Sequence, residues 1–345
     1  MNRRDTEDGV VLLLILVIIV AIVGSVYAFT ATTTLDVLSL RNRTDRIRAE
    51  MLAHSGLEIA LQILAEDVDE NTPSPRTGKE TWGDEWRILS QESIIPEEDH
   101  ELKIKIQDSG SWISLNALID LQGKGLSEAR PFLLAVLTKV IDDMPGRDED
   151  KFYDPEKLAD GIMDWIDVDS VTRLGENEVA YYAKQGGTTD PQNRPIFSLQ
   201  ELSAVPGMDQ ELLTELKSYF SPFPFVFAPG AAGVNPNTAP PHVLATIFYG
   251  APASKKRLLD ARDVFTIMRS RERDEIFCRG AGEKCTTFQA SLGLAGQNVF
   301  PQLQFASSIF DVRIEARVRE SRFRMRTVID RTDPAEPMFI FHRVL

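Results

Sequence analysis

The chain opens with two hydrophobic patterns in succession. A polar leader of nine residues, 1–9, is followed by twenty uncharged and mostly apolar residues from Val10 to Phe29. At about 1.5 Å per residue, such a run forms a helix of roughly 30 Å, which matches the hydrocarbon core of a bilayer. We therefore predict a transmembrane helix over 10–29. The alternative is a cleavable secretory signal that ends near Ala28.

Helix-compatible sequence continues beyond the apolar run. Spacings of four, three and four, which are typical of an amphipathic helix, separate Leu57, Leu61, Leu64 and Val68. No proline occurs before Pro73, so we predict one helix from Val10 to about Val68, roughly 90 Å long. A stripe of small residues allows close contact with a neighbouring helix or with the chain's own sheet; it consists of Ala49, Ala53, Gly56 and Ala60.

Alternating patterns predict a small antiparallel sheet built from distant parts of the chain. Strands are predicted at 81–89 and at 102–107, and apolar and polar residues alternate in the second of them. The clearest alternation predicts a hairpin of two strands, 312–319 and 322–329, joined at Glu320-Ser321. One face of this hairpin is buried. The other is rich in arginine and either binds phosphate or forms a solvated outer surface.

The segment between the strand regions, 116–307, has mainly helical periodicity, clearest in 131–141 and 254–269. Two further stretches, SLQELSAVPGM (198–208) and VNPNTAPPHVL (234–244), resemble helix-hairpin-helix units. Such units either hold DNA backbones through exposed turn amides or serve only for packing. The fold class is therefore predicted to be α+β, with a helical domain inserted into a small sheet domain.

Net charge indicates which partners are unfavourable, and the two cysteines indicate the compartment. The net charge of −14 argues against nucleic acid as a partner of the soluble part. Cys278 and Cys285 lie in the loop FCRGAGEKC, and a local disulfide in an oxidising compartment such as a bacterial periplasm is the simplest interpretation.

The four histidines are scattered and no phosphate-binding glycine loop is present. We therefore predict that the protein is not an enzyme.

The most acidic segment, 142–190, contains 14 Asp or Glu and only 5 Lys or Arg. Its centre offers five candidate metal ligands, which are Asp164, Asp167, Asp169, Glu176 and Glu178. Calcium takes about six to eight oxygen ligands, which clustered carboxylates can supply. An EF-hand register that starts at Asp167 fails, because Val171 and Thr172 hold positions that need an oxygen ligand and a glycine. We predict a calcium loop of another type; the alternative is a helix cap with a solvated acidic surface.

Several motifs occur in an order that resembles a known family. They are the leader ending at Gly9, the apolar run, HSGLEIAL (54–61), SWISLNAL (111–118), the block DWIDVD (164–169) and the two hairpin-like segments. Together they resemble the protein K family of the general secretion pathway, the large minor pseudopilin of type II secretion. The resemblance implies a pseudopilin fold, in which a long N-terminal helix packs on a small antiparallel sheet, with a large inserted all-helical domain.

The resemblance also implies how the chain is processed and assembled. It implies cleavage after Gly9 by the prepilin peptidase, N-methylation of Val10, and assembly with I-type and J-type minor pseudopilins above the major pseudopilin. It implies a single-pass protein of the bacterial inner membrane whose C-terminal domain lies in the periplasm. It further implies calcium in the acidic block, with Glu176 and Glu178 as interchangeable ligands. The predicted division is a leader 1–9, a transmembrane helix 10–29, pseudopilin segments 30–115 and 308–345, and an insert 116–307.

Leu14 is the fifth residue after the expected cleavage site. Most pilins and pseudopilins carry a glutamate there, which is thought to pair with the amino terminus of a neighbouring subunit. A carboxylate at bilayer depth costs about 2.5 to 3.5 kcal/mol on insertion scales, so it needs a partner. A subunit with no neighbour above it has none, and the bulky insert would block such a neighbour.

Leu14 and the insert together predict a subunit that initiates and caps a periplasmic pseudopilus, the filament that drives export of folded proteins across the outer membrane. The alternative is a membrane-anchored DNA-binding protein that uses the helix-hairpin-helix units.

Overall fold

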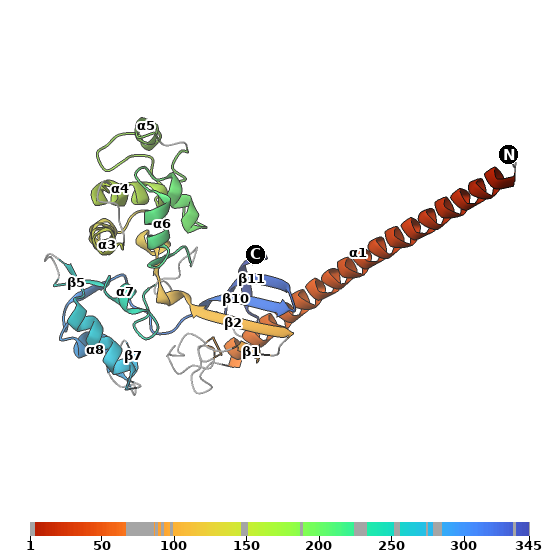
Figure 1. Ribbon diagram of the computed structural model, residues 1–345. Helices are drawn as coiled ribbons and strands as arrows, with labels where there is room; N and C mark the ends of the chain where they lie inside the picture. Colours follow the sequence, from red (N-terminus) through yellow and green to blue (C-terminus); the bar gives the residue numbers. More distant parts are fainter. Residues whose placement is uncertain are drawn as a thin grey trace.

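The computed structural model describes residues 4–66, 86, 89–90, 93–96, 99–145, 151–186, 189–223, 233–251, 256–273, 275–278, 285–333 and 336–344. One unbroken helix, α1 (Arg4–Glu66), accounts for 63 of these residues. It projects away from a small sheet, and a second, mainly helical body lies on the other side of that sheet (Figure 1). The long N-terminal helix predicted from the sequence is confirmed, although Val68 lies outside the described residues.

The first half of α1 has the properties of a membrane anchor. Its apolar side chains from Val11 to Phe29 are exposed, and Leu14 exposes 57% of its surface. In the part of the chain that the structure describes, α1 is the one helix that is long and apolar enough to cross a membrane. Among the described residues, the helix contacts the sheet only from Asp45 onward.

The sheet has five antiparallel strands in the order β1-β2-β10-β11-β12. Strand β2 pairs with β10 across more than 200 residues of sequence, as the predicted pairing of distant segments requires. The strands are β1 (Ser93–Pro96), β2 (His100–Asp108), β10 (Ile309–Val318), β11 (Ser321–Asp330) and β12 (Met338–Val344).

Two details of the predicted sheet differ from the structure. The hairpin turns at Arg319 and Glu320, one residue earlier than expected, because Ser321 already pairs with Val318 and Arg319 takes the left-handed conformation at φ 52°. The strand predicted at 81–89 lies mostly outside the described residues. Of that stretch, Trp86 and Leu89 are helical, so the prediction is wrong there.

The small residues of α1 pack against the chain's own sheet. Ala49, Ala53 and Ala60 are fully buried. A Cβ atom on Gly56 would lie 3.0 Å from Cδ1 of Leu102, so the absence of a side chain allows the helix axis to approach the strands closely. Of the two alternatives left open by the sequence, the structure therefore favours contact with the sheet.

Two arginines fix the ends of the helix-sheet contact. At the end nearer the membrane anchor, Arg319 in the hairpin turn donates to both carboxylate oxygens of Asp45 at 3.2 Å. At the other end, Arg331 donates to the Leu64 carbonyl oxygen at 2.9 Å. The hairpin turn thus points toward the membrane side, and the insert begins at the opposite end of the sheet.

The insert has one hydrophobic core that draws on residues from Ile113 to Leu303. The α+β class is confirmed. Helices dominate the insert, but it is not all-helical as predicted, because two strand pairs, β3-β4 and β7-β8, and a three-stranded sheet, β6-β5-β9, lie among the helices. The elements are η1 (Ser109–Ser111), β3 (Ile113–Ser114), η2 (Leu115–Leu118), α3 (Ala129–Asp143), α4 (Pro155–Ile166), α5 (Glu178–Lys184), η3 (Leu199–Ala204), α6 (Gln210–Leu216), β4 (Phe220–Ser221), α7 (Pro241–Leu244), β5 (Phe248–Gly250), β6 (Arg257–Leu258), α8 (Ala261–Arg271), β7 (Phe277–Cys278), β8 (Thr286–Thr287), α9 (Phe288–Ser291) and β9 (Asn298–Phe300).

Candidate functional site

The acidic block folds into a tight loop between α4 and α5. Helix α4 ends at Ile166, and the backbone N–H of the next residue, Asp167, donates to the Met163 carbonyl oxygen. The chain then turns back on itself between Thr172 and Glu176, and Gly175 supplies the left-handed conformation at φ 83° that this turn requires. Because of this turn, Glu178 at the start of α5 lies opposite the residues that follow α4.

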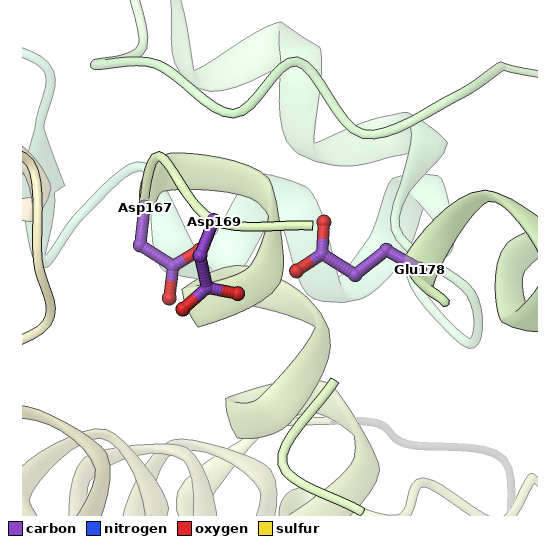
Figure 2. Close-up of side chains that lie close together, drawn as sticks. All are labelled: Asp167, Asp169 and Glu178. Carbon is purple, nitrogen blue, oxygen red and sulfur yellow. The ribbon is translucent and has the colours of Figure 1, made fainter. Parts of the chain in front are cut away.

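Three carboxylates meet in this loop. Asp167, Asp169 and Glu178 each place an oxygen within 4.8 Å of the other two, and Figure 2 shows the two aspartates facing Glu178 across a common space. Both carboxylate oxygens of Glu178 are buried and accept no well-formed hydrogen bond, and the same holds for Oδ1 of Asp167. Buried carboxylates without a donor are costly, so a group that supplies positive charge would stabilise the loop.

Three carboxyl groups of the loop have raised pKa values. Burial, together with the neighbouring negative charges, raises the pKa of Asp164, Asp167 and Glu178 to about 7 each, and burial is the largest cause. The main contributing charge is that of Glu178 for Asp164 and that of Asp169 for Asp167. The side chain of Asn193 opposes the shift at Glu178 but does not cancel it. Without a cation, these groups therefore hold protons near neutral pH.

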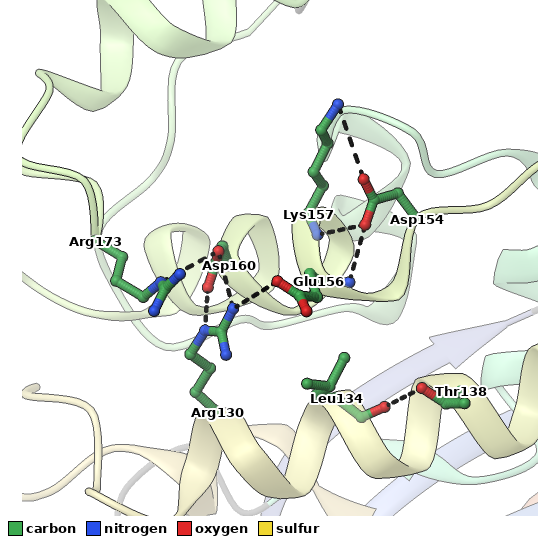
Figure 3. A network of polar contacts seen from close by, with 8 residues as sticks. All are labelled: Arg130, Leu134, Thr138, Asp154, Glu156, Lys157, Asp160 and Arg173. Atoms are coloured by element: carbon green, nitrogen blue, oxygen red, sulfur yellow. Dashed lines mark hydrogen bonds and ion pairs between the residues drawn. The ribbon is translucent and has the colours of Figure 1, made fainter.

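Other carboxylates of the acidic block have cationic partners. Figure 3 shows Asp160 of α4 bridged by Arg130 of α3 and by Arg173, which lies 3.5 Å away. Asp154 lies 3.8 Å from Lys157 and caps the start of α4. Ordinary ion pairs and caps thus account for the outer part of the block, whereas Asp167 and Glu178 have no such partner among the described residues.

The structure separates the five ligands predicted from the sequence. Asp167, Asp169 and Glu178 form the cluster. Asp164 is buried in α4, near enough to the cluster that the charges of Asp167 and Glu178 raise its pKa. Glu176 lies outside the cluster, half exposed, and binds Lys184 at 3.0 Å. The two glutamates that the sequence left interchangeable therefore have different surroundings.

Asn193 is a member of the site that sequence reasoning missed. Its Oδ1 is buried without a hydrogen bond, and its Nδ2 donates to the backbone carbonyl oxygen of Asp169. The residue adopts φ 49°, a left-handed conformation in which asparagine is enriched. An isolated asparagine in a polar stretch, 24 residues after Asp169, carries little signal in a sequence.

This arrangement fits a hard divalent cation. The cluster offers carboxylate oxygens and one amide oxygen, which are the ligands that calcium prefers. The unsatisfied oxygens of Glu178, Asp167 and Asn193 are the independent structural observation in favour of such an ion. The calcium prediction itself stays a prediction.

The second hairpin-like segment, 234–244, has its polar groups turned inward. The side chains of Asn235, Asn237 and Thr238 are buried. Asn237 exchanges two hydrogen bonds with the backbone of Phe277, and Thr238 donates to Asp108. In the first segment, Gly207 makes the turn at φ 85° between η3 and α6. These contacts correspond to the packing interpretation of the segments.

The remaining predicted site residues lie apart from the acidic loop. Gly9 and Val10 belong to α1, and the structure does not describe the side chain of Val10. Cys278 and Cys285 are joined by a disulfide at the parallel strand pair β7 and β8. Leu14 lies on the exposed surface of α1.

Comparisons with known proteins agree on one group. Residues 113–224 match the family model described as type II secretion system protein K. The chain is 24% identical over 264 residues to type II secretion system protein K of Klebsiella pneumoniae, a match that covers 76% of this chain and 75% of the relative. It is also 24% identical over 265 residues to the Pseudomonas aeruginosa protein of the same name, covering 75% and 73%.

A solved structure shares the fold. It comes from the GspK-GspI-GspJ complex of the type 2 secretion system of enterotoxigenic Escherichia coli. The match has a TM-score of 0.56 and 19% identity, and it covers 88% of this chain and 98% of the other. The alternative of a membrane-anchored DNA-binding protein is not supported by these comparisons.

Proposed function

We propose that this chain is a minor pseudopilin of the type II secretion system, of the protein K family, and that it initiates and caps the periplasmic pseudopilus. The resemblance noted in the sequence agrees with the family model over 113–224 and with the relatives. Its role is one of assembly rather than catalysis.

The observation that carries this proposal is the position of the insert. The insert and the membrane-spanning half of α1 lie on opposite sides of the sheet (Figure 1). A second subunit that stacked on top would have to occupy the space of the insert. Leu14 supports the same conclusion from the membrane end, because a subunit at the tip has no neighbour above it whose amino terminus a carboxylate there would meet.

The proposal includes the processing and location of the chain. The prepilin peptidase cleaves after Gly9, and Val10 is then N-methylated. The helix 10–29 anchors the protein once in the bacterial inner membrane, and the sheet domain and insert lie in the periplasm, where the Cys278–Cys285 disulfide is stable. The partners are I-type and J-type minor pseudopilins, by analogy with the GspK-GspI-GspJ complex that shares the fold, and the major pseudopilin below them.

Two measurements test this function. Mass spectrometry of the protein purified from membranes should find methylated Val10 as the first residue, whereas a first residue after Ala28 would contradict the proposal. Immunogold labelling of isolated pseudopili should mark one end only. Labels distributed along the filament would contradict the tip position.

We also propose that the acidic loop binds calcium with a structural role. Asp167, Asp169 and Glu178 would hold the ion, with Asp164 and Asn193 completing the site. Bound calcium supplies the positive charge that the buried oxygens of Glu178 and Asp167 lack. By joining the end of α4, the start of α5 and the segment around Asn193, the ion would fix three parts of the insert to one another.

A further inference from the structure

The outer face of the sheet, opposite α1, carries three rows of mostly basic side chains. Strand register places Lys105, Arg313, Arg326 and Arg343 in one row across four strands. The next two rows, toward the hairpin turn, add Lys103, Glu315, Arg324, Glu101, Arg317 and Arg322. Eight of these ten residues are Lys or Arg. We call these ten residues the basic face, and it is notable on a chain whose net charge is −14.

Ion pairs neutralise only part of the basic face. Asp311 in the adjoining row binds Arg326 at 2.8 Å and Arg313 at 3.0 Å. Glu315 binds Arg324, and Glu101 binds Lys103 and Arg317. Three cations, each exposed, have no ion-pair partner among the described residues; they are Lys105, Arg322 and Arg343.

The arrangement is unfavourable for the isolated chain. Like charges directly opposite each other on neighbouring strands destabilise a sheet, and Arg326 stands between Arg313 and Arg343 in the register. Arg317 likewise stands opposite Arg322. An anionic surface on a partner would offset this repulsion between like charges and would therefore stabilise the basic face in the assembled state.

The membrane in which the chain is anchored is too far from the basic face to be this anionic surface. The apolar run ends at Phe29, and the sheet begins at the level of Asp45, where Arg319 of the hairpin turn binds. The sixteen helical rises from Phe29 to Asp45 span about 24 Å. This distance is well beyond the Debye length of about 8 Å at physiological ionic strength, so lipid headgroups do not reach the basic face.

The globular domain of a neighbouring subunit with the same type of anchor can reach the basic face. Such a subunit would hold its own globular domain at the same height above the bilayer, beside this sheet, whereas the insert projects above that level. We propose that the basic face docks an acidic surface on the globular domain of a neighbouring minor pseudopilin of I type or J type. This inference rests on the proposed function and specifies which surface the partner must present.

The test measures binding of a purified I-type and J-type pseudopilin complex to the full chain in nanodiscs of zwitterionic lipid. One variant reverses the unpaired cations (K105E, R322E and R343E). A matched control reverses three exposed basic residues of the insert (K124E, R262E and R269E), which changes the net charge equally. Circular dichroism and melting temperature confirm that both variants fold.

We expect the sheet variant to bind about tenfold more weakly or worse, and the control within about twofold of the wild type. Wild-type binding should weaken between about 50 and 300 mM NaCl, and the sheet variant should lose most of this salt dependence. Equal weakening of both variants, or none, overturns the inference while the proposed function stands. Absence of wild-type binding contradicts the proposed function itself.

Repeating the measurement in nanodiscs that contain anionic lipid tests the competing occupant. If anionic headgroups occupied the basic face, they would weaken binding of the I-type and J-type complex to the wild type but not to the sheet variant. That result would overturn the inference as well. Equal affinity in both lipids supports it.

Discussion

The carboxylate of Asp108, at the end of β2, accepts a hydrogen bond of 2.5 Å from the hydroxyl of Thr238, which lies 130 residues further along the chain. The same carboxylate accepts from the backbone N–H of Gly110 at 2.6 Å and from Nδ2 of Asn235 at 3.1 Å. All of these groups are buried. One side chain of the sheet therefore fixes both the first and the middle segment of the insert.

Replacing Asp108 by Ala should destabilise the protein strongly. The variant would leave buried donors on Gly110, Asn235 and Thr238 without an acceptor, at an expected cost of about 2 to 4 kcal/mol. Thermal unfolding of the full chain in detergent measures the loss. Gln107→Ala, on the opposite face of the same strand, is the control and should change stability by no more than about 0.5 kcal/mol. Equal melting of the two variants would disprove the role of Asp108.

Glu178→Gln should separate the two states of the acidic loop. It removes a buried charge at nearly constant volume, so the metal-free protein should become more stable, while calcium should lose most of its stabilising effect. In the wild type, calcium at a hundredfold excess over Kd should add about 2.7 kcal/mol, or roughly 5 to 10 °C in Tm. Scanning calorimetry with calcium and with a chelator gives both values.

Glu176→Gln is the matched control, because Glu176 binds Lys184 outside the cluster. It should preserve the response to calcium. A wild-type Tm that does not depend on calcium would refute the metal site, and equal responses of the two variants would refute the assignment of Glu178.

The pH dependence of stability should differ between the metal-free and the calcium-bound protein. The pKa values of Asp164, Asp167 and Glu178 are raised to about 7 in the folded metal-free protein, whereas they lie near 4 in an unfolded chain. The folded state thus binds more protons than the unfolded state between about pH 4 and 7, and stability falls as pH rises through this range.

Calcium competes with these protons, so saturating calcium should remove the fall or reverse it. Melting curves from about pH 4.5 to 8, with chelator and with calcium, test the prediction. Parallel curves under the two conditions would contradict it.

Leu14→Glu should leave the periplasmic domains folded and impair assembly. The carboxylate would carry an insertion cost of about 2.5 to 3.5 kcal/mol without gaining a partner at the tip. Filament number and secretion in cells are the readouts. Leu13→Glu places the same charge at nearly the same depth and should impair assembly to a similar extent. Assembly and secretion at wild-type levels would show that assembly does not require an apolar residue at position 14.

The sequence predicts those parts of the structure whose signals are local. Alternation in 312–319 and 322–329 identifies β10 and β11, because a sheet with one covered face requires a period of two. The spacing of Asp167, Asp169 and Glu178 likewise lies within a single loop. Glu176 and Glu178 look alike in sequence, since only the turn at Gly175 and the start of α5 decide which one faces inward.

Contacts between distant segments leave no such signal. Asp108 looks like the last residue of an ordinary strand, and its partners Asn235 and Thr238 lie in a segment that resembles a DNA-binding hairpin. Asn193 reaches the acidic loop only because the chain passes it again after α5. The basic face is visible in β10 and β11 alone as an arginine stripe, but Lys105 and Arg343 join it only through strand register.

The continuity of α1 has a mechanical consequence. Helix α1 contains no proline and no break, so the helix of the processed chain, which begins at Val10, runs for about 85 Å from the bilayer along the whole sheet. Arg319 and Arg331 hold its second half against the sheet at both ends, and Asp108 holds the sheet to the insert. We therefore expect an axial displacement of the anchor to move the sheet and, through the contacts of Asp108, the insert with it.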